Sequence, residues 1–415
     1  MRILFLTNFY PPYELGGQGR SCQQAVEGMK ERGHSVMVLT SMHGTDNQSV
    51  QDEDVYRCLY LEMDMVPLRH SLVFFTQRKQ RVQHNLAKTQ QILTDFQPDV
   101  VFIWGMWNLS HALPELIETQ MARRVVYRFA EYWPTLPSQH ELYWRAPAQS
   151  LASRIVKTPL SRVALFMLAQ EAQPPQLKFD NVICVSAATR DVLVKGGVPV
   201  ADARIIHTGI EITDNPCGAE PDEDETRDLK LLYAGRLSAD KGVETAIEAM
   251  EHLVHKLDMQ QVKLSLAGSG SEEYMRHLRE LVARADLENY VTFLGWVPHE
   301  EMPQLMCQFD AALVPSKWPE PFARVVLEGM SFGLVVIATP SGGTSEIIRN
   351  KENGLLFTSG DFQDLAQAVT YIAANPEFRH KLRNTGRKTV REQFTITKML
   401  DAYEAFLKEA AGVSS

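Results

Sequence analysis

Short apolar runs rich in β-branched residues alternate with longer amphipathic stretches along most of the chain. In the first half, these runs lie at 2–8, 35–40, 99–104, 124–129 and 181–186. Segments of helical length separate them, near 18–32, 76–96 and 186–196. Apolar strands that alternate with helices predict βαβ units and a buried parallel sheet.

An acidic segment at 214–228 interrupts this alternation. It carries seven acidic residues and two prolines and has almost nothing to bury, which is typical of a solvated linker. Strand-like runs then resume at 229–235, 262–268, 290–295, 310–316 and 334–339. Helical stretches follow near 242–256, 272–285, 322–332, 362–374 and 377–411. We therefore predict an α/β protein with two Rossmann-like domains facing across a cleft. The predicted parts are an N-terminal domain at 1–213, the linker at 214–228, a C-terminal ligand-binding domain at 229–394 and a helix at 395–415 that returns toward the first domain.

Length and composition narrow the class further. A chain of 415 residues is too long for one ordinary hydrophobic core, so two domains are expected. Its net charge is −9, and neither half is basic enough to indicate a domain that binds nucleic acid. No run approaches the roughly 20 apolar residues of a membrane span, and the first apolar run is too short for a signal peptide. The five scattered cysteines predict neither a disulfide nor a zinc site. Together these features favour a protein of the reducing cytoplasm.

The strongest motif is PSKWPEPFARVVLEGMSFG at 315–333, where Glu320 and Glu328 are eight positions apart. A helix that begins near Phe322 leaves the first backbone N–H groups free to bind polar oxygens or phosphate. A carboxylate accepts two hydroxyl hydrogen bonds, so two carboxylates can hold a sugar ring and a ribose. The alternative is that Glu320 only caps the helix and Glu328 is a solvated helical residue.

A second motif, YAGRLSADKGVETAI at 233–247, places Arg236 and Lys241 between a strand and a helix. Arginine makes forked contacts with phosphate oxygens, and lysine acts as a point charge. The pair is suited to neutralising a diphosphate leaving group. The alternative is two surface cations on a loop.

Two glycine pairs mark other turns. Gly16-Gly17 follows the first strand and allows backbone amides to approach a phosphate, but Cys22 breaks the dinucleotide-binding glycine pattern. Gly342-Gly343 lies at a strand-to-helix turn, with Glu346 one turn into the helix. Alone, this second pair predicts only the start of a helix.

Taken together, these motifs resemble those of family-4 retaining glycosyltransferases of the GT-B fold, over nearly the whole chain. The matching positions are Gly16-Gly17, Arg32-Gly33-His34 with the strand after it, Gly235-Arg236-Leu237, Lys241-Gly242, Glu320-Pro321-Phe322 and Glu328. The resemblance implies donor-binding roles for Gly16, Gly17, Arg236, Lys241, Val297, Glu320, Phe322, Ala323, Arg324 and Glu328. It implies catalytic roles for Arg236, Lys241 and Glu320.

The resemblance also implies which part of the donor each group binds. Arg236 and Lys241 are expected on the diphosphate and Glu328 on the ribose. Glu320 is expected on the donor sugar, together with the following amides, and the backbone near Val297 beside the base.

Three positions depart from the family pattern. Ala323 replaces the usual glycine, so that an extra methyl is expected to crowd the sugar, and Thr208 replaces a frequent asparagine. Ala130 stands where many members have a histidine near the reacting centre, in the run Ala130-Glu131-Tyr132-Trp133-Pro134. Either Glu131 takes over part of the acceptor contact, or no side chain is needed there. If the leaving phosphate itself removes the acceptor proton, as is argued for such enzymes, the protein needs no base of its own.

The first domain offers an acceptor side. From their position after the predicted strands and the capacity of aromatic rings to stack on sugars, the expected acceptor residues are Trp104, Asn108, Glu131, Tyr132 and Trp133. The alternative is that the aromatic ones are ordinary core or rim residues. The segment 120–162 is basic and runs into an apolar stretch. It predicts a patch that lies on an anionic membrane at its inner face, or else a helix packed on the sheet with its basic side solvated.

The resulting hypothesis is sugar transfer, with retention, from a UDP-sugar or a GDP-sugar, UDP being favoured. The acceptor is a saccharide, lipid-linked or small molecule. Neither a metal nor another cofactor is required, because the nucleotide sugar is a co-substrate and two cations face its diphosphate. The alternatives are a phosphorylase or sugar-nucleotide epimerase on a related scaffold, or a non-catalytic protein that binds nucleotide sugars.

Overall fold

A computed structural model describes the chain except residues 14–15, 47, 64–66, 149–150, 172–175, 214–216, 218–227 and 414–415. The chain forms two compact units. Unit 1 comprises Met1–Cys184, Thr189–Ile206 and Leu400–Ser415, and unit 2 comprises Val185–Ala188 and His207–Met399. Apart from Cys217 and Asp228, the expected acidic linker at 214–228 lies outside the described residues.

Unit 1 is built on an eight-stranded sheet in the order β3-β4-β2-β1-β5-β6-β7-β8. Only the β3–β4 pair is antiparallel. The strands are β1 (Arg2–Thr7), β2 (Ser35–Ser41), β3 (Val50–Asp52), β4 (Val55–Leu59), β5 (Val100–Gly105), β6 (Val125–Phe129), β7 (Val182–Cys184) and β8 (Arg204–Ile205). The central strands β1 and β5 are almost entirely buried, as expected for a parallel sheet covered on both faces.

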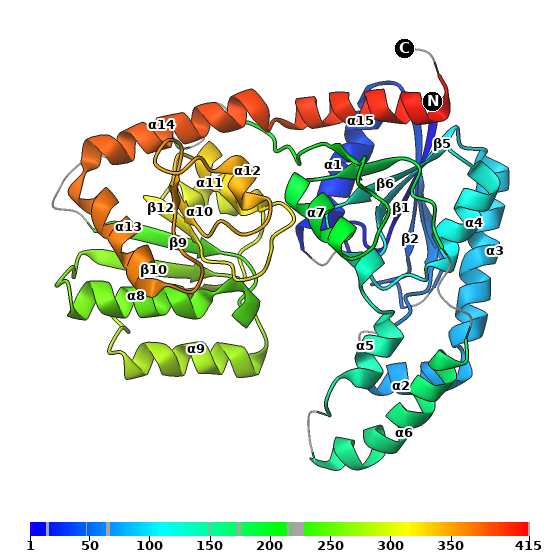
Figure 1. The fold of residues 1–415 in the computed structure, drawn as a ribbon, viewed down its shortest axis with the longest axis horizontal. Helices are drawn as coiled ribbons and strands as arrows, with labels where there is room; N and C mark the ends of the chain where they lie inside the picture. Colours follow the sequence, from blue (N-terminus) through cyan, green and yellow to red (C-terminus); the bar gives the residue numbers. More distant parts are fainter. Residues whose placement is uncertain are drawn as a thin grey trace. The chain divides into compact units, whose positions relative to one another are not determined.

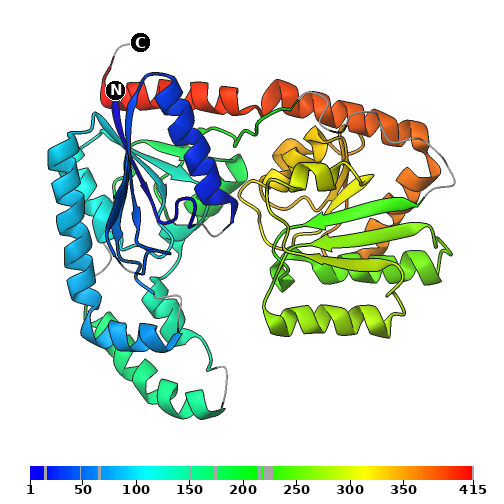
Figure 2. The same cartoon turned by 180° about the vertical axis from the view of Figure 1, so that it is seen from behind.

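Helices cover both faces of this sheet. In Figures 1 and 2, α1 (Gly17–Glu31) lies on one face, and α3 (Arg78–Phe96) and α4 (Ala112–Met121) lie on the other. The remaining helix of the central body is α7 (Ala187–Lys195), which follows β7. The C-terminal helix α15 (Ile396–Ala411) ends in unit 1, where Arg32 pairs with Asp401 at 2.8 Å.

Three further helices extend from unit 1 as a helical arm. They are α2 (Pro67–Thr76), α5 (Gln139–Arg145) and α6 (Leu151–Ala169), with a short turn η1 (Trp133–Thr135) before α5. Figures 1 and 2 show them together beyond one end of the sheet. Among the described residues, no helix is both long enough and apolar enough to cross a membrane.

Unit 2 is built on a six-stranded, fully parallel sheet in the order β11-β10-β9-β12-β13-β14. Its strands are β9 (Leu229–Ala234), β10 (Val262–Ala267), β11 (Val291–Gly295), β12 (Ala311–Val314), β13 (Val335–Ala338) and β14 (Leu355–Leu356). Alternate residues of β9 and β13 enter two separate cores, one on each face. Because both of their faces are buried, β12 and β13 read as continuous apolar runs, whereas β9 and β10 each contain a lysine.

The helices of unit 2 divide between those two cores. One core includes α8 (Val243–His255), α9 (Glu272–Arg284) and α13 (Phe362–Ala374). The other includes α10 (Met302–Met306), α11 (Arg324–Ser331), α12 (Thr344–Ile347) and α14 (Pro376–Gln393). A short turn, η2 (Ala239–Lys241), precedes α8. The predicted α/β class with two Rossmann-like units is therefore confirmed.

The helical stretch at 377–411 divides into α14 and α15, because Ile210 hydrogen-bonds with the backbone of Phe394 and Ile396 between them. One expectation was wrong: Cys217 and Cys307 form a disulfide across 90 positions. Their separation in sequence concealed a proximity that the fold creates. Cys22, Cys58 and Cys184 are buried free thiols.

Candidate donor site

The carboxyl ends of the parallel strands in unit 2 meet along one edge of the sheet. The loops after β9, β11, β12 and β13 begin at this edge, and they carry most of the predicted donor residues. Parallel sheets bind ligands at such edges because loops and helix N-termini converge there. The site is therefore assembled from segments that are distant in sequence.

Lys241 is positioned by a tight turn between β9 and α8. It ends η2, and Gly242 then adopts a left-handed conformation with φ 69° before α8 begins. A Cβ atom on Gly242 would lie 1.9 Å from the carbonyl oxygen of Pro315. Glycine is therefore required for the β9 loop to pack against the β12 loop.

The ammonium group of Lys241 contacts the carboxylate of Glu320. Nζ lies 2.5 Å from Oε1, and both side chains are largely buried. The Ser316 hydroxyl donates to the same carboxylate oxygen at 2.7 Å. The structure thus brings together two residues that the sequence placed in separate motifs, and it adds Ser316, which sequence reasoning missed.

Arg236 lies in the same loop but is more exposed. Its guanidinium group pairs with Asp240 at 3.1 Å, and its side chain is 67% exposed. Burial alone would raise the pKa of Asp240, but a hydrogen bond from Ser238 and the charges of Arg236 and Lys241 lower it overall. Asp240 therefore stays ionised and holds Arg236 beside Lys241.

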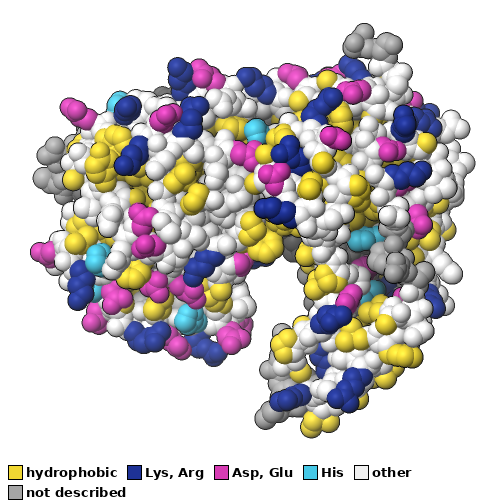
Figure 3. Space-filling view, viewed as in Figure 1, with side chains coloured by type: hydrophobic (Ala, Val, Ile, Leu, Met, Phe, Trp, Pro, Cys, Tyr) yellow, Lys and Arg dark blue, Asp and Glu magenta, His cyan; other side chains and the backbone are white. Residues whose placement is uncertain are grey.

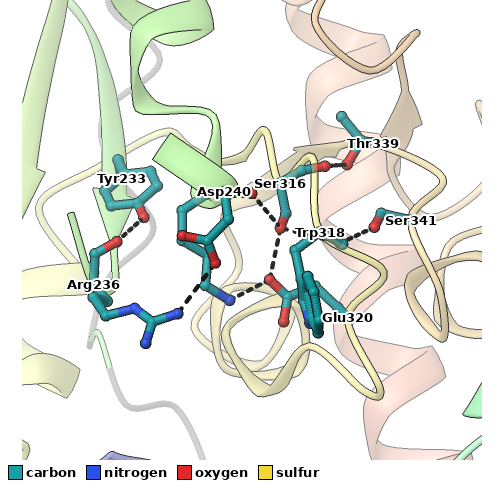
Figure 4. Close-up of polar contacts among 9 residues, drawn as sticks. Tyr233, Arg236, Asp240, Ser316, Trp318, Glu320, Thr339 and Ser341 are labelled. Carbon is teal, nitrogen blue, oxygen red and sulfur yellow. Dashed lines mark hydrogen bonds and ion pairs between the residues drawn. The ribbon is translucent and has the colours of Figure 1, made fainter. Parts of the chain in front are cut away.

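The loop after β12 is held by backbone contacts (Figure 4). The N–H groups of Lys317 and Trp318 donate to the Asp240 carbonyl at 2.9 and 3.0 Å. Hydroxyl groups of two residues after β13 complete the frame: Thr339 donates to the Ser316 carbonyl at 2.6 Å, and Ser341 to that of Trp318. The indole of Trp318 remains 41% exposed on this fixed backbone. Sequence reasoning did not single it out.

The helix that carries Glu328 begins later than predicted. Ala323 is the N-cap of α11, and the first helical residue is Arg324 rather than Phe322. The carbonyl of Glu320 accepts from the Gly343 N–H at 2.8 Å, and that of Pro321 from the Ser186 hydroxyl at 2.6 Å. Because these carbonyls are already engaged, the preceding segment stays a loop.

Within α11, Glu328 lies 3.6 Å from Arg324, one turn before it. This partner was not foreseen as such, because Arg324 was predicted only as an amide donor. The methyl of Ala323 belongs to the buried core of this face. Its φ of −79° is ordinary, so the backbone does not require glycine at this position.

The second glycine pair, Gly342-Gly343, packs against the loop after β12 that carries Glu320, and Glu346 follows it in α12. Gly342 has φ 55°, and a Cβ there would lie 2.1 Å from the Glu320 carbonyl oxygen. Glu346 accepts from the N–H groups of Ala187 and Ala188 at 3.1 and 2.9 Å. It also pairs with His207 at 3.0 Å. Although burial would raise its pKa, these hydrogen bonds lower the pKa of Glu346 below its ordinary value.

His207 connects Glu346 to Phe322 in the loop after β12. Its ring stacks on Phe322 with centroids 5.2 Å apart and an angle of 17° between the planes. The stack and the Glu346 contact together fix where Phe322 lies. No motif signalled His207, because its partners come from distant positions.

The remaining predicted donor residues occupy separate places. Val297 follows β11 at the carboxyl edge of the unit 2 sheet and packs against one of its cores. Gly16 and Gly17 belong to unit 1, where Gly16 has φ 80° and Gly17 begins α1. Their predicted phosphate contact stays a prediction.

Most of the expected acceptor residues are core side chains in this structure. Trp104 is 1% exposed and lies beneath the guanidinium group of Arg128, at 4.1 Å from the ring centroid. Tyr132 and Trp133 are buried in the core of unit 1. Asn108 is buried and uses its amide on the backbone of Met63. Rings packed in this way present no exposed face for stacking.

Glu131 also serves the local backbone. Its Oε1 accepts from the N–H groups of Met106 and Trp107 at 3.1 and 3.4 Å. Burial raises the pKa of Glu131, and these hydrogen bonds partly offset the rise. The carboxylate therefore shapes the loop after β5 in this structure.

A small pocket lies beside this loop and contains residues that sequence reasoning missed. Its lining includes Glu62, Trp107, His111 and Gln139. Burial raises the pKa of Glu62 to about 7, although the Gln139 N–H donates to it at 3.2 Å. Burial lowers the pKa of His111. No sequence motif marks either residue.

Comparisons with known proteins identify two family models and several relatives. A family model described as glycosyl transferases group 1 matches residues 220–389, and one described as glycosyltransferase family 4 matches residues 15–214. Glycogen synthase of Mycobacterium tuberculosis strain H37Rv is 25% identical over 408 residues, covering 95% of this chain and 91% of that protein.

Solved structures share the fold. Sucrose-phosphate synthase from Thermosynechococcus elongatus superposes with a TM-score of 0.71 at 19% identity and covers all of both chains. Anabaena HepE in complex with UDP-glucose gives 0.67 at 21% identity, covering 99% of this chain and 100% of that one. The GT-B architecture expected from the sequence is thus found in solved structures.

Proposed function

Because the chain belongs to the family of group 1 and family 4 glycosyltransferases, we propose that it transfers a sugar from a UDP-sugar, with retention of configuration. A GDP-sugar is the second donor candidate. The proposed acceptor is a saccharide, a lipid-linked sugar or a small molecule. Peripheral contact with a membrane, on the cytoplasmic side, belongs to the same proposal.

The contact between Lys241 and Glu320 carries this proposal. A diphosphate that approaches the β9 loop offers Lys241 a new anionic partner, with Arg236 in the same loop as a second cation. Glu320 is then released to accept hydrogen bonds from the hydroxyl groups of a donor sugar. One rearrangement thus prepares both the phosphate and the sugar contacts.

Ribose binding is assigned to Glu328 on α11. Its carboxylate is 23% exposed, and its neighbour Arg324 lies in the first turn of that helix. A vicinal diol donates two hydrogen bonds to one carboxylate. Solved HepE structures in complex with UDP and UDP-glucose support a UDP-sugar as the first donor to test.

Retention follows from the proposed chemistry of the leaving group. The donor's bond between the anomeric carbon and the phosphate oxygen breaks, and the acceptor oxygen attacks from the same face. The departing phosphate oxygen takes the acceptor proton, so the position of Ala130 requires no base. Arg236 and Lys241 stabilise the negative charge that develops on the diphosphate, and this role makes a metal ion unnecessary in the proposal.

The test is a donor panel combined with calorimetry. We expect UDP to bind, slow hydrolysis of one nucleotide sugar without acceptor, and faster turnover with the correct acceptor. NMR of the first product should show the anomeric configuration of the donor, and a chelator should leave the rate unchanged. Binding without turnover of any donor would favour a non-catalytic role, and an inverted product would contradict retention.

A further inference from the structure

The helical arm of unit 1 has a small core of its own. Phe74, Trp144 and Ala164 are buried together, one from each of α2, α5 and α6. The hydroxyl groups of Ser71 and Tyr143 lie 2.7 Å apart and link α2 to α5. The arm therefore has a defined inner side, and α6 turns its opposite side to solvent.

That outer side of α6 is apolar, although an exposed helix face is ordinarily polar. Ile155, Val163 and Phe166 are 78%, 51% and 65% exposed. Their spacing places them on one face of the helix, away from the buried Ala164. Leu72 on α2 is 66% exposed as well. Apolar side chains gathered in this way mark a surface that binds an apolar partner.

Basic side chains lie among the apolar ones. Arg154 and Arg162 are exposed on α6, whose sequence contains no acidic residue. Nearby carboxylates are already paired, as Glu141 is with Arg145 at 2.8 Å. Figure 3 shows hydrophobic and basic side chains together on the arm at the lower right. Such a mixture is complementary to anionic headgroups above an apolar interior.

We propose that the helical arm docks the protein onto an anionic lipid bilayer. Ile155, Val163 and Phe166 enter the boundary between headgroups and acyl chains, while Arg154 and Arg162 contact lipid phosphates. This docking rests on the proposed function, because an acceptor carried on a lipid would meet unit 1 at the membrane surface.

Charge favours a bilayer over a second copy of the chain. In a twofold dimer formed through this face, Arg154 and Arg162 would meet the same cations of the other copy. Repulsion between these arginines opposes such a dimer, because α6 has no carboxylate that could neutralise them. An anionic bilayer satisfies the apolar and the cationic side chains at the same time.

The experiment is co-sedimentation of the full chain with vesicles of phosphatidylcholine, with or without phosphatidylglycerol. We expect binding to the anionic vesicles, weakened by salt. An Ile155→Ser/Phe166→Ser variant should lower the partition coefficient at least about tenfold, because two exposed anchors are lost. An Arg154→Gln/Arg162→Gln variant should lose the preference for anionic vesicles. Leu257→Ser removes an exposed apolar side chain of unit 2 and serves as the matched control.

Four results would overturn the inference. Three are no binding to anionic vesicles, equal binding to neutral ones, and undiminished binding of the Ile155→Ser/Phe166→Ser variant. The fourth is a dimer in analytical ultracentrifugation that the same substitutions abolish, which would assign the arm to a second copy instead. Thermal unfolding checks that each variant is folded.

Donor hydrolysis in solution separates this inference from the proposed function. The arm variants should keep it, because none of these side chains belongs to the proposed donor site. A wild-type protein that binds vesicles but turns over no donor would contradict the proposed function and leave the docking result standing.

Discussion

Lys241 Nζ lies 2.5 Å from Glu320 Oε1, although 79 positions separate the two residues. The contact joins the loop after β9 to the loop after β12 at the carboxyl edge of the unit 2 sheet. A cation and an anion of the proposed donor site therefore neutralise each other in the structure. Donor binding must exchange this contact for new ones.

Replacing Lys241 with alanine should lower kcat/KM at least about 100-fold, because roughly 3 kcal/mol of transition-state stabilisation on the diphosphate is lost. Steady-state kinetics with the identified donor measures the effect. Lys381→Ala removes an exposed lysine of α14 and should change nothing. Near wild-type turnover in Lys241→Ala would disprove the assignment.

Replacing Glu328 with alanine should also cost about 100-fold in kcat/KM, through the lost ribose contact. Calorimetry should show weaker UDP binding, because the ribose belongs to the nucleotide. Glu280→Ala removes an exposed carboxylate of α9 and is the comparison. If UDP affinity is unchanged in Glu328→Ala, the residue does not bind the ribose.

The exposed indole of Trp318 offers an apolar face on a backbone held by Asp240 and Ser341. We predict that it stacks on a sugar of the donor or acceptor. Trp318→Ala should then raise KM for that substrate about tenfold, whereas Trp318→Phe should retain most of the affinity. Tyr371→Ala, an exposed aromatic of α13, is the control. Equal effects of alanine and phenylalanine would argue against stacking.

His140 makes folding stability depend on pH. Burial, and then the nearby charges of His70, Arg78 and Arg81, lower its pKa from 6.5 to about 3. The native state therefore binds fewer protons than the unfolded state between these values. Stability from this residue is complete above pH 6.5 and decreases toward pH 3, by about 1.4 kcal/mol per pH unit.

The measurement is the free energy of unfolding between about pH 7 and pH 5, where few carboxylates titrate. His140→Phe keeps the aromatic contact with Phe74 and should flatten the dependence. His277→Gln changes an exposed histidine and should not. Identical slopes for His140→Phe and the wild type would refute the role of His140.

The sheets were predictable because their signal is local. β1 is an apolar run after Arg2, and β9 is apolar except for Lys230; such a run is visible without knowing its neighbours. β14 has only two residues, Leu355 and Leu356, which is too short to show a period. Its pairing with β13 depends on where the chain returns after α12.

The candidate site was predictable in its residue types but not in its contacts. Lys241 and Glu320 stood out because each lies in a recognisable motif, whereas Ser316 and His207 act through partners far away in sequence. The start of α11 shifted because Gly343 engages the carbonyl of Glu320. Such competition for one carbonyl cannot be seen from the helical pattern alone.

By itself, the sequence determined the α/β class, the two units and the charged residues of the loops after β9 and β12, because apolar periodicity and motif chemistry are local properties. Only the tertiary structure decided that Trp104 lies in the core, that Cys217 meets Cys307 and that Phe166 faces solvent. These outcomes depend on which distant segments pack together. Burial and pairing are properties of that packing, and no short stretch of sequence contains them.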